Sequence, residues 1–252
     1  MMLHIDGSTH QWLGAAADSQ DLITVMDDAT SEIYYAKLVE QESTATVMEA
    51  LKVVIEQQGV FCSLYSDRAS PFVLTPKAGG RPSRTVLTQV GRALEQLGIE
   101  LIPAGSPQAR GRCERSYRTF QERLPQELRA EGISTLEAAN RFLEQTSLVQ
   151  HNSNFTVAPT QQGSAFVPYA GSELDKIFSR QSERIVANDN TVTLGKLRLQ
   201  VEQQKFRFSM AKCRELVCEH LERTISLWYG PHLFGRYDRE GQLLQRQQKS
   251  AA

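Results

Sequence analysis

The chain has 252 residues, of which 40% are hydrophobic and 23% are charged, and this composition is typical of a soluble globular protein with one or two domains. Its 28 basic and 29 acidic residues give a net charge of −1, which excludes a uniformly basic nucleic-acid coat protein and an acidic disordered chain. There is no secretory signal and no apolar run long enough for a membrane span, and the four cysteines fit neither a disulfide framework nor a zinc site, so we expect a cytoplasmic protein without a membrane partner.

Strand and helix patterns alternate over the first two-thirds of the chain. A short apolar strand at 3–5 ends at Asp6, and β-rich segments on either side of an Asp-rich turn predict an antiparallel hairpin. We expect Pro125 to kink or end the long helix that contains it. Hairpin strands followed by strand–helix–strand units predict an α/β fold with a mixed sheet and flanking helices. The expected strands are 3–5, 22–26, 33–39, 60–65 and 99–102, and the expected helices are 43–58, 85–97, 108–130 and 135–151.

The last third of the chain changes to short strand patterns separated by Gly, Pro and Asp-rich turns. These patterns predict a small all-β barrel, although the helical propensity of 212–222 competes with a strand there. We therefore expect a first domain at 1–168, a linker at 169–184 and a β-rich DNA-binding domain at 185–252. The expected strands lie at 191–194, 196–201, 206–208, 224–229 and 235–237.

Three carboxylates occupy positions where an α/β sheet presents ligands. Asp6 and Asp67 each follow a predicted strand, and Glu114 lies in the first turns of the long helix. If the first two of these strands are parallel neighbours, their carboxylates lie about 4.8 Å apart. Convergent carboxylates without a suitable His or Cys favour a site for Mg²⁺ or Mn²⁺, and two such ions would suit phosphoryl transfer. The alternative is that the aspartates cap turns and the glutamate is a solvated helix residue.

The residues around these acids resemble a known family. The three stretches 4–12, 64–72 and 106–124, in this order, are similar to those of DDE transposases and retroviral-type integrases, and Asp-Gly-Ser-Thr-His-Gln-Trp at 6–12 is most similar to ISNCY-type bacterial insertion-sequence transposases. The resemblance implies a ribonuclease-H-like, mixed five-stranded sheet with flanking helices, followed by an SH3-like barrel. It also implies that Asp6, Asp67 and Glu114 are the catalytic residues and the ligands of two Mg²⁺ or Mn²⁺ ions.

The same resemblance implies the reaction and the partners. Family members hydrolyse a phosphodiester at the transposon ends, and the freed 3′-hydroxyl then attacks target DNA. They act as multimers, so we expect a homo-oligomer in the bacterial cytoplasm, associated with the nucleoid. Family members also carry a helix-turn-helix region before the catalytic core, whereas this chain begins five residues before Asp6. The alternative hypothesis is therefore a truncated remnant that only binds DNA or inhibits a full-length transposase.

An arginine cluster surrounds Glu114 and gives residues 110–123 a net charge of +3. We expect the cluster to contact DNA phosphates, although a solvated helix with i,i+4 ion pairs would have the same pattern. His10 and Trp12 are further candidates for DNA contact, and packing under the sheet is the alternative. The arginines proposed for DNA binding are Arg110, Arg112, Arg115 and Arg118.

Three further polar or aromatic pairs have simpler interpretations. We assign Asp27 and Asp28 to turn formation rather than to metal binding. We expect Asn152, which follows His151, to cap a helix. Trp228 and Tyr229 are candidates either for stacking on bases or for the core of the β-rich domain. Residues 151–252 carry a net charge of +4 and residues 1–100 carry −6, so the neutral sum conceals a basic tail.

Overall fold

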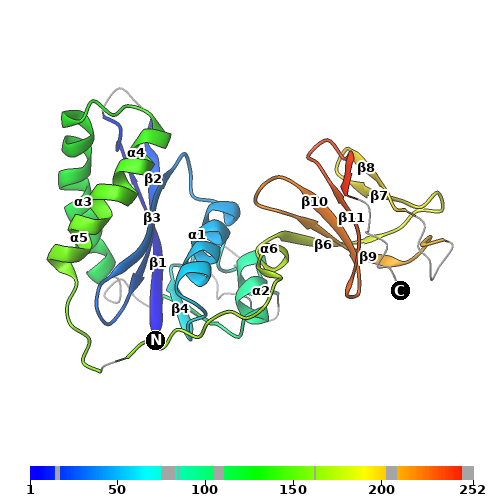
Figure 1. The fold of residues 1–252 in the computed structure, drawn as a ribbon, viewed down its shortest axis with the longest axis horizontal. Coiled ribbons are helices and arrows are strands. Elements are labelled where there is room, and N and C mark those ends of the chain that lie inside the picture. Colours follow the sequence, from blue (N-terminus) through cyan, green and yellow to red (C-terminus); the bar gives the residue numbers. More distant parts are fainter. Residues whose placement is uncertain are drawn as a thin grey trace. The chain divides into compact units, whose positions relative to one another are not determined.

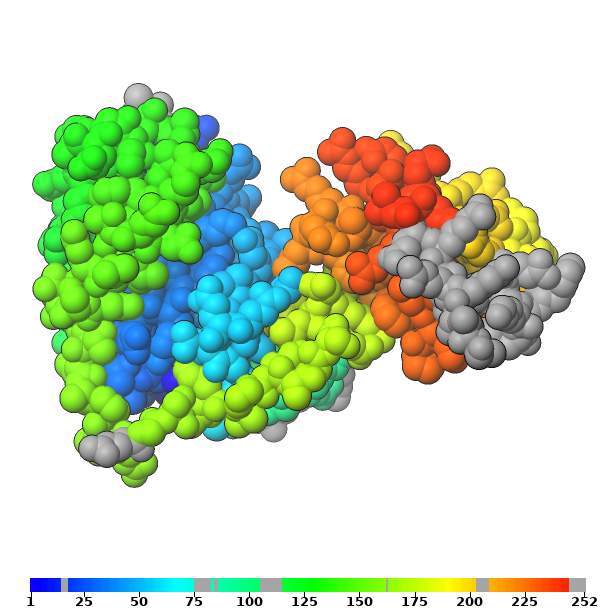
Figure 2. Space-filling view, viewed as in Figure 1, coloured from blue at the N-terminus to red at the C-terminus, as the bar shows by residue number. Residues whose placement is uncertain are grey.

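The computed structural model describes residues 1–14, 18–74, 83, 86–104, 111–161, 163–202 and 209–245, with the side chains of 111–114 and 245 outside this description. The chain divides into two compact units, Met1–Gly171 and Ser172–Ala252. Each unit is a closely packed body with its own sheet (Figure 1, Figure 2). No helix in the described ranges combines the length and apolar character needed to cross a bilayer.

The first unit is built on a mixed five-stranded sheet with the order β3-β2-β1-β4-β5. The strand β2 is antiparallel to both β1 and β3, whereas β4 runs parallel to β1 and β5 runs parallel to β4. The expected mixed sheet with flanking helices is therefore confirmed. Its strands are β1 (Met2–His10), β2 (Gln20–Asp27), β3 (Ile33–Val39), β4 (Ser63–Ser66) and β5 (Glu100–Pro103).

The first strand is longer than its apolar residues indicate. We expected it to end at Asp6, but β1 continues to His10 and pairs with β2 throughout, with Asp6 opposite Thr24. The prediction was wrong because β2 supplies backbone partners along the whole length of β1, which allows polar residues to remain in the strand. The parallel pairing of β1 with β4 is shorter and ends at His4 and Tyr65.

Helices cover both faces of this sheet (Figure 1). The helix α1 begins after Ser43, whose hydroxyl accepts from the Thr46 amide in a capping box, and α2 begins after Thr88, which caps it in the same way. The helix expected at 135–151 is interrupted by one π-helical turn, η2, and continues to Phe155. One face carries α1 (Thr44–Gln57) and α2 (Gln89–Gln96), and the other carries α3 (Gly111–Ala130), α4 (Leu136–Phe142), η2 (Leu143–Ser147) and α5 (Leu148–Phe155).

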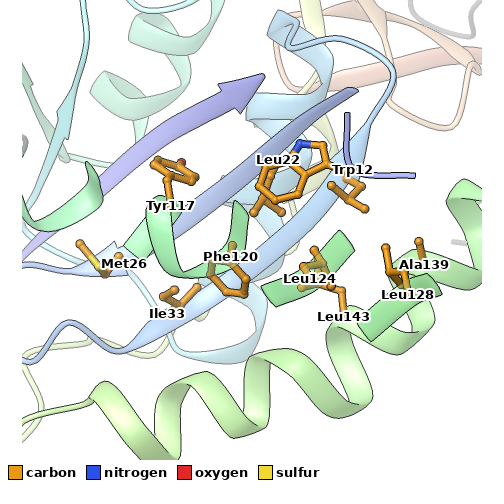
Figure 3. Close-up of a cluster of buried hydrophobic side chains, with 11 residues drawn as sticks. Trp12, Leu22, Met26, Ile33, Tyr117, Phe120, Leu124, Leu128, Ala139 and Leu143 are labelled. Carbon is orange, nitrogen blue, oxygen red and sulfur yellow. The ribbon is translucent and has the colours of Figure 1, made fainter. Parts of the chain in front are cut away.

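The helix α3 continues through Pro125, so the expectation that the helix kinks or ends there receives no support from its span. A proline inside a helix costs about 3 kcal/mol, but each buried large apolar side chain contributes about 1.5–3 kcal/mol. Phe120, Leu124 and Leu128 are buried on both sides of the proline, and this packing offsets its cost. Figure 3 shows α3 side chains of this core over β2 and β3 and beside Trp12.

Two asparagines bind the outer strand of the sheet. Asn140 of α4 accepts from the amide of Leu38 at 2.7 Å and donates to its carbonyl at 2.9 Å. Asn152 of α5 makes the same pair of bonds with Ile33, at 3.0 and 2.9 Å. The expectation that Asn152 caps a helix was therefore wrong. Its amide instead pairs like a strand with the edge of β3, which otherwise offers backbone groups to other chains.

The second unit contains a short helix and two antiparallel sheets. Its larger sheet has the order β12-β11-β10-β9-β6, and β7 and β8 form a separate hairpin. A core of apolar side chains that includes Val192, Leu199, Val217 and Leu227 joins the two. The elements are α6 (Leu174–Ile177), β6 (Arg180–Ile185), β7 (Thr191–Leu194), β8 (Leu197–Gln200), β9 (Arg214–Glu219), β10 (Ile225–Tyr229), β11 (His232–Tyr237) and β12 (Leu243–Gln245).

Some elements of this unit differ from the sequence prediction. The range 169–184, expected to be a linker, contains α6 and most of β6. The range 212–222 forms strand β9 rather than a helix, since β6 and β10 pair with it on both sides. Residues 206–208 lie outside the described residues, and the SH3-like barrel stays a prediction.

The two aromatic residues of β10 belong to packing within this unit. The Trp228 indole donates to the Ser226 hydroxyl at 2.8 Å, and the Lys176 ammonium lies 4.1 Å from its ring centre. Tyr229 stacks on Phe234 with ring centres 5.8 Å apart. These contacts agree with the core interpretation of both rings.

Candidate active site

Asp6 and Asp67 come from neighbouring parallel strands of the first sheet. The strands pair in the register Leu3 with Leu64 and His4 with Tyr65. The same offset, continued by two residues, places Asp6 opposite Asp67, just beyond the last paired residues. Parallel neighbours lie about 4.8 Å apart, so this register brings the two aspartates together at the end of the parallel pairing.

The residues two positions earlier show which face of the sheet is involved. His4 and Tyr65 are in ring contact, with centres 4.9 Å apart, so their side chains share a face. Side chains two residues apart along a strand point to the same side. Asp6 therefore shares the face of His4, and Asp67 stands two residues after Tyr65, just beyond the end of β4. This is the face covered by α3, because Ser116 of that helix contacts Met26, the strand partner of His4.

Both carboxylates are partly exposed and hydrogen-bonded to nearby backbone amides. One oxygen of Asp6 accepts from the Gly7 amide at 3.1 Å, and one oxygen of Asp67 accepts from the Ala69 amide at 2.8 Å. Such bonds orient a carboxylate and favour its charged form. The Arg68 guanidinium next to Asp67 donates to the Ala104 carbonyl at 3.1 Å, which links the end of β4 to the end of β5.

The helix α3 is attached to β1 at the level of Asp6. The buried hydroxyl of Tyr117 donates to the backbone carbonyl of Asp6 and lies 2.8 Å from the hydroxyl of Thr24, the strand partner of Asp6. One turn further along the helix, Gln121 donates to the Ser8 hydroxyl at 2.9 Å. The helix and β1 thus run in the same direction, and the turn that contains Glu114 comes one turn before Tyr117.

The strand register sets two of the three predicted ligands at neighbouring positions, and the structure describes only the backbone of the third. Glu114 belongs to α3, but its side chain lies outside the described residues, as does that of Arg112, and Arg110 lies wholly outside them. Among the side chains that the structure describes, no group of three or more His, Cys, Asp or Glu residues could hold a metal ion.

The remaining arginines of the cluster lie on the exposed side of α3. Arg115 and Arg118 are exposed, and no salt bridge of Arg118 is found among the described residues. Arg123, further along, makes an i,i+4 ion pair with Glu127 at 3.3 Å. The alternative of a solvated helix with ion pairs therefore describes Arg123, whereas Arg118 keeps its charge available for an anion.

Two other predicted candidates have internal partners. Trp12 is fully buried, and its indole donates to the Ser8 carbonyl at 3.2 Å, so the packing interpretation holds for Trp12 and its side chain cannot reach DNA in this structure. His10 is partly exposed and lies edge-on against Trp12, with ring centres 5.1 Å apart.

The aspartates of the β2–β3 turn have structural roles. One carboxylate oxygen of Asp27 accepts from both the amide and the hydroxyl of Thr30, the turn chemistry that the sequence predicts. Asp28 instead binds the buried His4 imidazole at 2.8 Å. This contact ties the turn to β1 two residues before Asp6.

Two residues beside the site were missed by sequence reasoning. Tyr117 was overlooked because its i+3 spacing from Glu114 is ordinary in an amphipathic helix, and only the fold places its hydroxyl on Asp6. Glu42 lies over Gly7, where an added Cβ would fall 2.2 Å from its carboxylate oxygen. The glycine after Asp6 therefore makes room for an acid on the opposite face of the sheet from α3.

Sequence comparison places this geometry among related proteins. The chain is 34% identical over 225 residues to a protein of Sinorhizobium fredii that is named as a transposase, covering 81% of this chain and 48% of that protein. It is 29% identical over 235 residues to the transposase for insertion sequence IS1202 of Streptococcus pneumoniae, covering 90% of this chain and 48% of that one. The chain thus spans about half the length of these relatives, and the resemblance to transposases is confirmed.

Comparison with solved structures finds retroviral integrase cores. The catalytic core domain of BIV integrase has a TM-score of 0.42 and 18% identity, with 67% of this chain and 90% of that chain covered. The HTLV-2 integrase catalytic core domain in complex with magnesium has a TM-score of 0.41 and 13% identity, with 57% and 86% covered. No family model matches the sequence.

Proposed function

We infer that this chain, a relative of insertion-sequence transposases, is the catalytic part of a DDE transposase that cuts and joins DNA strands. The observation that carries the proposal is the register that sets Asp6 opposite Asp67 at the end of the parallel pairing. The helix that contains Glu114 is hydrogen-bonded to Asp6 itself through Tyr117. Three carboxylates on these three elements form a site for hard cations and phosphoryl transfer.

The donor set fits two Mg²⁺ or Mn²⁺ ions. Asp6 and Asp67 are partly exposed, so we assign their carboxylate oxygens as two of the ligands, and we assign Glu114 as the third from its place on α3. Hard divalent ions prefer oxygen donors, and no imidazole or thiolate is needed. When bound, such ions lower the pKa of a water or sugar hydroxyl and neutralise charge on the phosphate.

The chemistry is then two in-line displacements at phosphorus. In the first, a water oxygen attacks a phosphodiester at the transposon end, the bond to the 3′-oxygen breaks, and a free 3′-hydroxyl results. In the second, that 3′-hydroxyl attacks a target phosphodiester and displaces a target 3′-oxygen, so one phosphodiester is exchanged for another. No bond between protein and DNA forms. The role of the protein is to hold the two aspartates in register and to position the DNA.

Cationic side chains in both units support DNA binding. Arg115 and Arg118 lie exposed on α3 beyond Glu114, and the sequence adds Arg110 and Arg112 to the same stretch. In the second unit, arginines from β6 and from two turns line a separate cavity of about 510 Å³. One acid, Glu219, also lines the cavity and lies 4.0 Å from Arg180. The arginines outnumber it, and phosphates are their natural partners, so we assign a DNA-binding role to this unit. The arginines of this cavity are Arg180, Arg184, Arg223 and Arg239.

The proposal extends to partners and location. The substrates are the transposon ends and target DNA, and two ends require at least two active sites, so we propose a homo-oligomer. Its place of action is the bacterial cytoplasm at the nucleoid. We also propose that the second unit closes into an SH3-like barrel around the core that joins its sheet to the β7–β8 hairpin.

Single substitutions at the two aspartates test the catalytic assignment. Asp6→Asn and Asp67→Asn keep a side-chain oxygen that can accept from Gly7 and Ala69, so both variants should fold. We expect each to lose Mn²⁺-dependent nicking of supercoiled plasmid and Mn²⁺ binding by calorimetry. The control is Asp18→Asn, at an exposed aspartate before β2, which should behave as the wild type.

The outcomes separate the two hypotheses for this chain. Nicking that persists in both variants would overturn the assignment of the site. A wild-type chain that binds DNA but neither nicks nor joins it would instead favour the DNA-binding or inhibitory remnant. Loss of nicking together with a lowered melting temperature would show damage to the fold. In that case Mn²⁺ binding, measured on the folded fraction, decides whether the aspartate is a metal ligand.

A further inference from the structure

A second cavity lies beside α3, between this helix, the β2–β3 turn and the end of α5. It has a volume of about 500 Å³, within the range of small-molecule sites in proteins. The turn between β2 and β3 forms one wall, and the end of α5 forms another. The lining includes Arg115, Ser116, Arg118, Thr119, His151 and Phe155.

The polar part of this cavity is cationic. Arg115 and Arg118 both line it, and no acidic side chain is among the described residues that line it. Both arginines are exposed to solvent. Two guanidinium groups three residues apart on a helix lie on one face, and they suit the oxygens of a phosphate. An anion is therefore the ligand that the charges of the cavity favour.

The other part of the cavity is aromatic. His151 and Phe155 line it, with ring centres 4.8 Å apart and the two rings tilted by 45°. The His151 ring stacks on Phe120 at 4.5 Å, and Phe155 is 43% exposed. Burial lowers the pKa of His151 to about 4, so the imidazole is neutral at pH 7. The exposed ring of Phe155, next to a neutral imidazole, can stack on a nucleobase.

The imidazole also has an unsatisfied nitrogen. Nε2 of His151 is buried and makes no hydrogen bond to any described residue. Buried polar atoms are normally satisfied. A ligand group, or a water in the space of about 10 Å³ that His151 also lines, would satisfy it.

We propose that this cavity holds one unpaired nucleotide of the DNA substrate, with its phosphate on Arg115 and Arg118 and its base stacked on Phe155. This proposal rests on the proposed function. The cavity begins next to the catalytic residues, because Ser116 contacts Met26, which pairs with His4 two residues before Asp6. Arg115 directly follows Glu114 in α3. A strand whose phosphate is held there would pass from the cavity to the catalytic carboxylates.

A cycle of paired changes in protein and DNA tests the contact. The substrates are a duplex with one unpaired nucleotide beside its end, the same duplex with that nucleotide abasic, and a fully paired duplex. Each is bound to the full chain in Ca²⁺, and the dissociation constant is measured by fluorescence anisotropy. The protein variants are Phe155→Ala, Phe155→Leu and Arg118→Ala. The control is Val149→Ala, at an exposed apolar residue of α5 that does not line the cavity.

The expected result is a non-additive cycle. The wild type should bind the duplex with the unpaired nucleotide about tenfold more tightly than the abasic or the fully paired duplex. The reason is that stacking one base on an aromatic ring contributes about 1–3 kcal/mol. Phe155→Ala and Phe155→Leu should lose this preference and bind the abasic duplex as the wild type does. Arg118→Ala should weaken binding of all three duplexes, because each retains the phosphate.

Other results overturn the proposal in distinguishable ways. The nucleotide site is wrong, while the proposed function stands, if the wild type binds and nicks DNA without preferring the duplex with the unpaired nucleotide. The same conclusion follows if the losses of binding free energy from Phe155→Ala and from removal of the base are additive. If free deoxynucleoside monophosphate binds in a way that depends on Phe155, but the duplex with the unpaired nucleotide does not, the site belongs to a free nucleotide. If no duplex binds, the proposed function fails as well.

Discussion

The hydroxyl of Tyr117 is the contact through which the fold aligns α3 with Asp6. It donates to the Asp6 carbonyl and lies 2.8 Å from the Thr24 hydroxyl, and the ring is only 6% exposed. We predict that Tyr117→Phe lowers the rate of strand nicking much more than it lowers stability. The substitution keeps the ring in the core and removes only the oxygen that fixes the helix to β1.

The size of the effect follows from these two bonds. Removal of a buried hydroxyl leaves the Asp6 carbonyl and the Thr24 hydroxyl without this partner, which costs about 1–3 kcal/mol of stability. In a unit of this size that corresponds to a fall in melting temperature of roughly 2–12 °C. A shift of α3 of about 1 Å at the site would lower the rate by about 10²-fold.

The assay is Mn²⁺-dependent nicking under single-turnover conditions, with DNA binding and melting temperature measured on the same samples. Thr24→Val is the matched control, because it removes the other partner of the hydroxyl and keeps the Tyr117–Asp6 bond. We expect this variant to lose similar stability but less than threefold in rate. A wild-type nicking rate in Tyr117→Phe, or equal rate losses in both variants, would refute the positioning role.

Three further predictions concern stability. Asn152→Ala should lower the free energy of unfolding in urea by about 2 kcal/mol, because it leaves the amide and carbonyl of Ile33 without their partners. Asn140→Ala should have the same effect through Leu38, and losses below about 0.5 kcal/mol would contradict both predictions. Glu215 is buried, and burial raises its pKa from 4.5 to about 7, so the folded state binds the proton more tightly than the unfolded state. The free energy of unfolding of the second unit should therefore fall by up to about 3 kcal/mol as the pH rises from 4.5 to 7. Glu215→Gln should flatten that dependence in melting experiments, and an unchanged slope would show that another group titrates. His151 has the opposite sign, because its pKa is lowered from 6.5 to about 4: the first unit should lose stability as the pH falls through this range, and His151→Gln should weaken the loss.

Local patterns in the sequence were sufficient for many elements of the fold. The strand at Ile33–Val39 was predicted with its exact bounds, because β-branched and aromatic residues follow an Asp-rich turn. The start of α1 was visible in Ser43, whose side chain can satisfy a free amide at a helix start. These features depend on chemistry within a few residues, which the sequence displays directly.

The positions of Asp6 and Asp67 were predicted only in part. The sequence indicated that each acid lies near the end of a strand, and their similarity in order to transposase motifs favoured a shared site. The predicted end of β1 was wrong, because the length of a strand depends on the strands that pair with it. The pairing of β1 with β2 carries the strand past Asp6, and the shorter pairing with β4 is what ends beside it.

By itself the sequence determined the order of strands and helices in the first unit, the candidate carboxylates and the basic stretch around Glu114, because these are local or countable properties. Only the tertiary structure decided that Trp12 is a core residue, that Asn152 binds an edge strand and that Tyr117 joins α3 to Asp6. Each of these contacts joins residues that are remote in the chain or depends on which face is covered. Side-chain type does not specify such a partner, since a buried polar group takes whichever one the packing brings within hydrogen-bond distance.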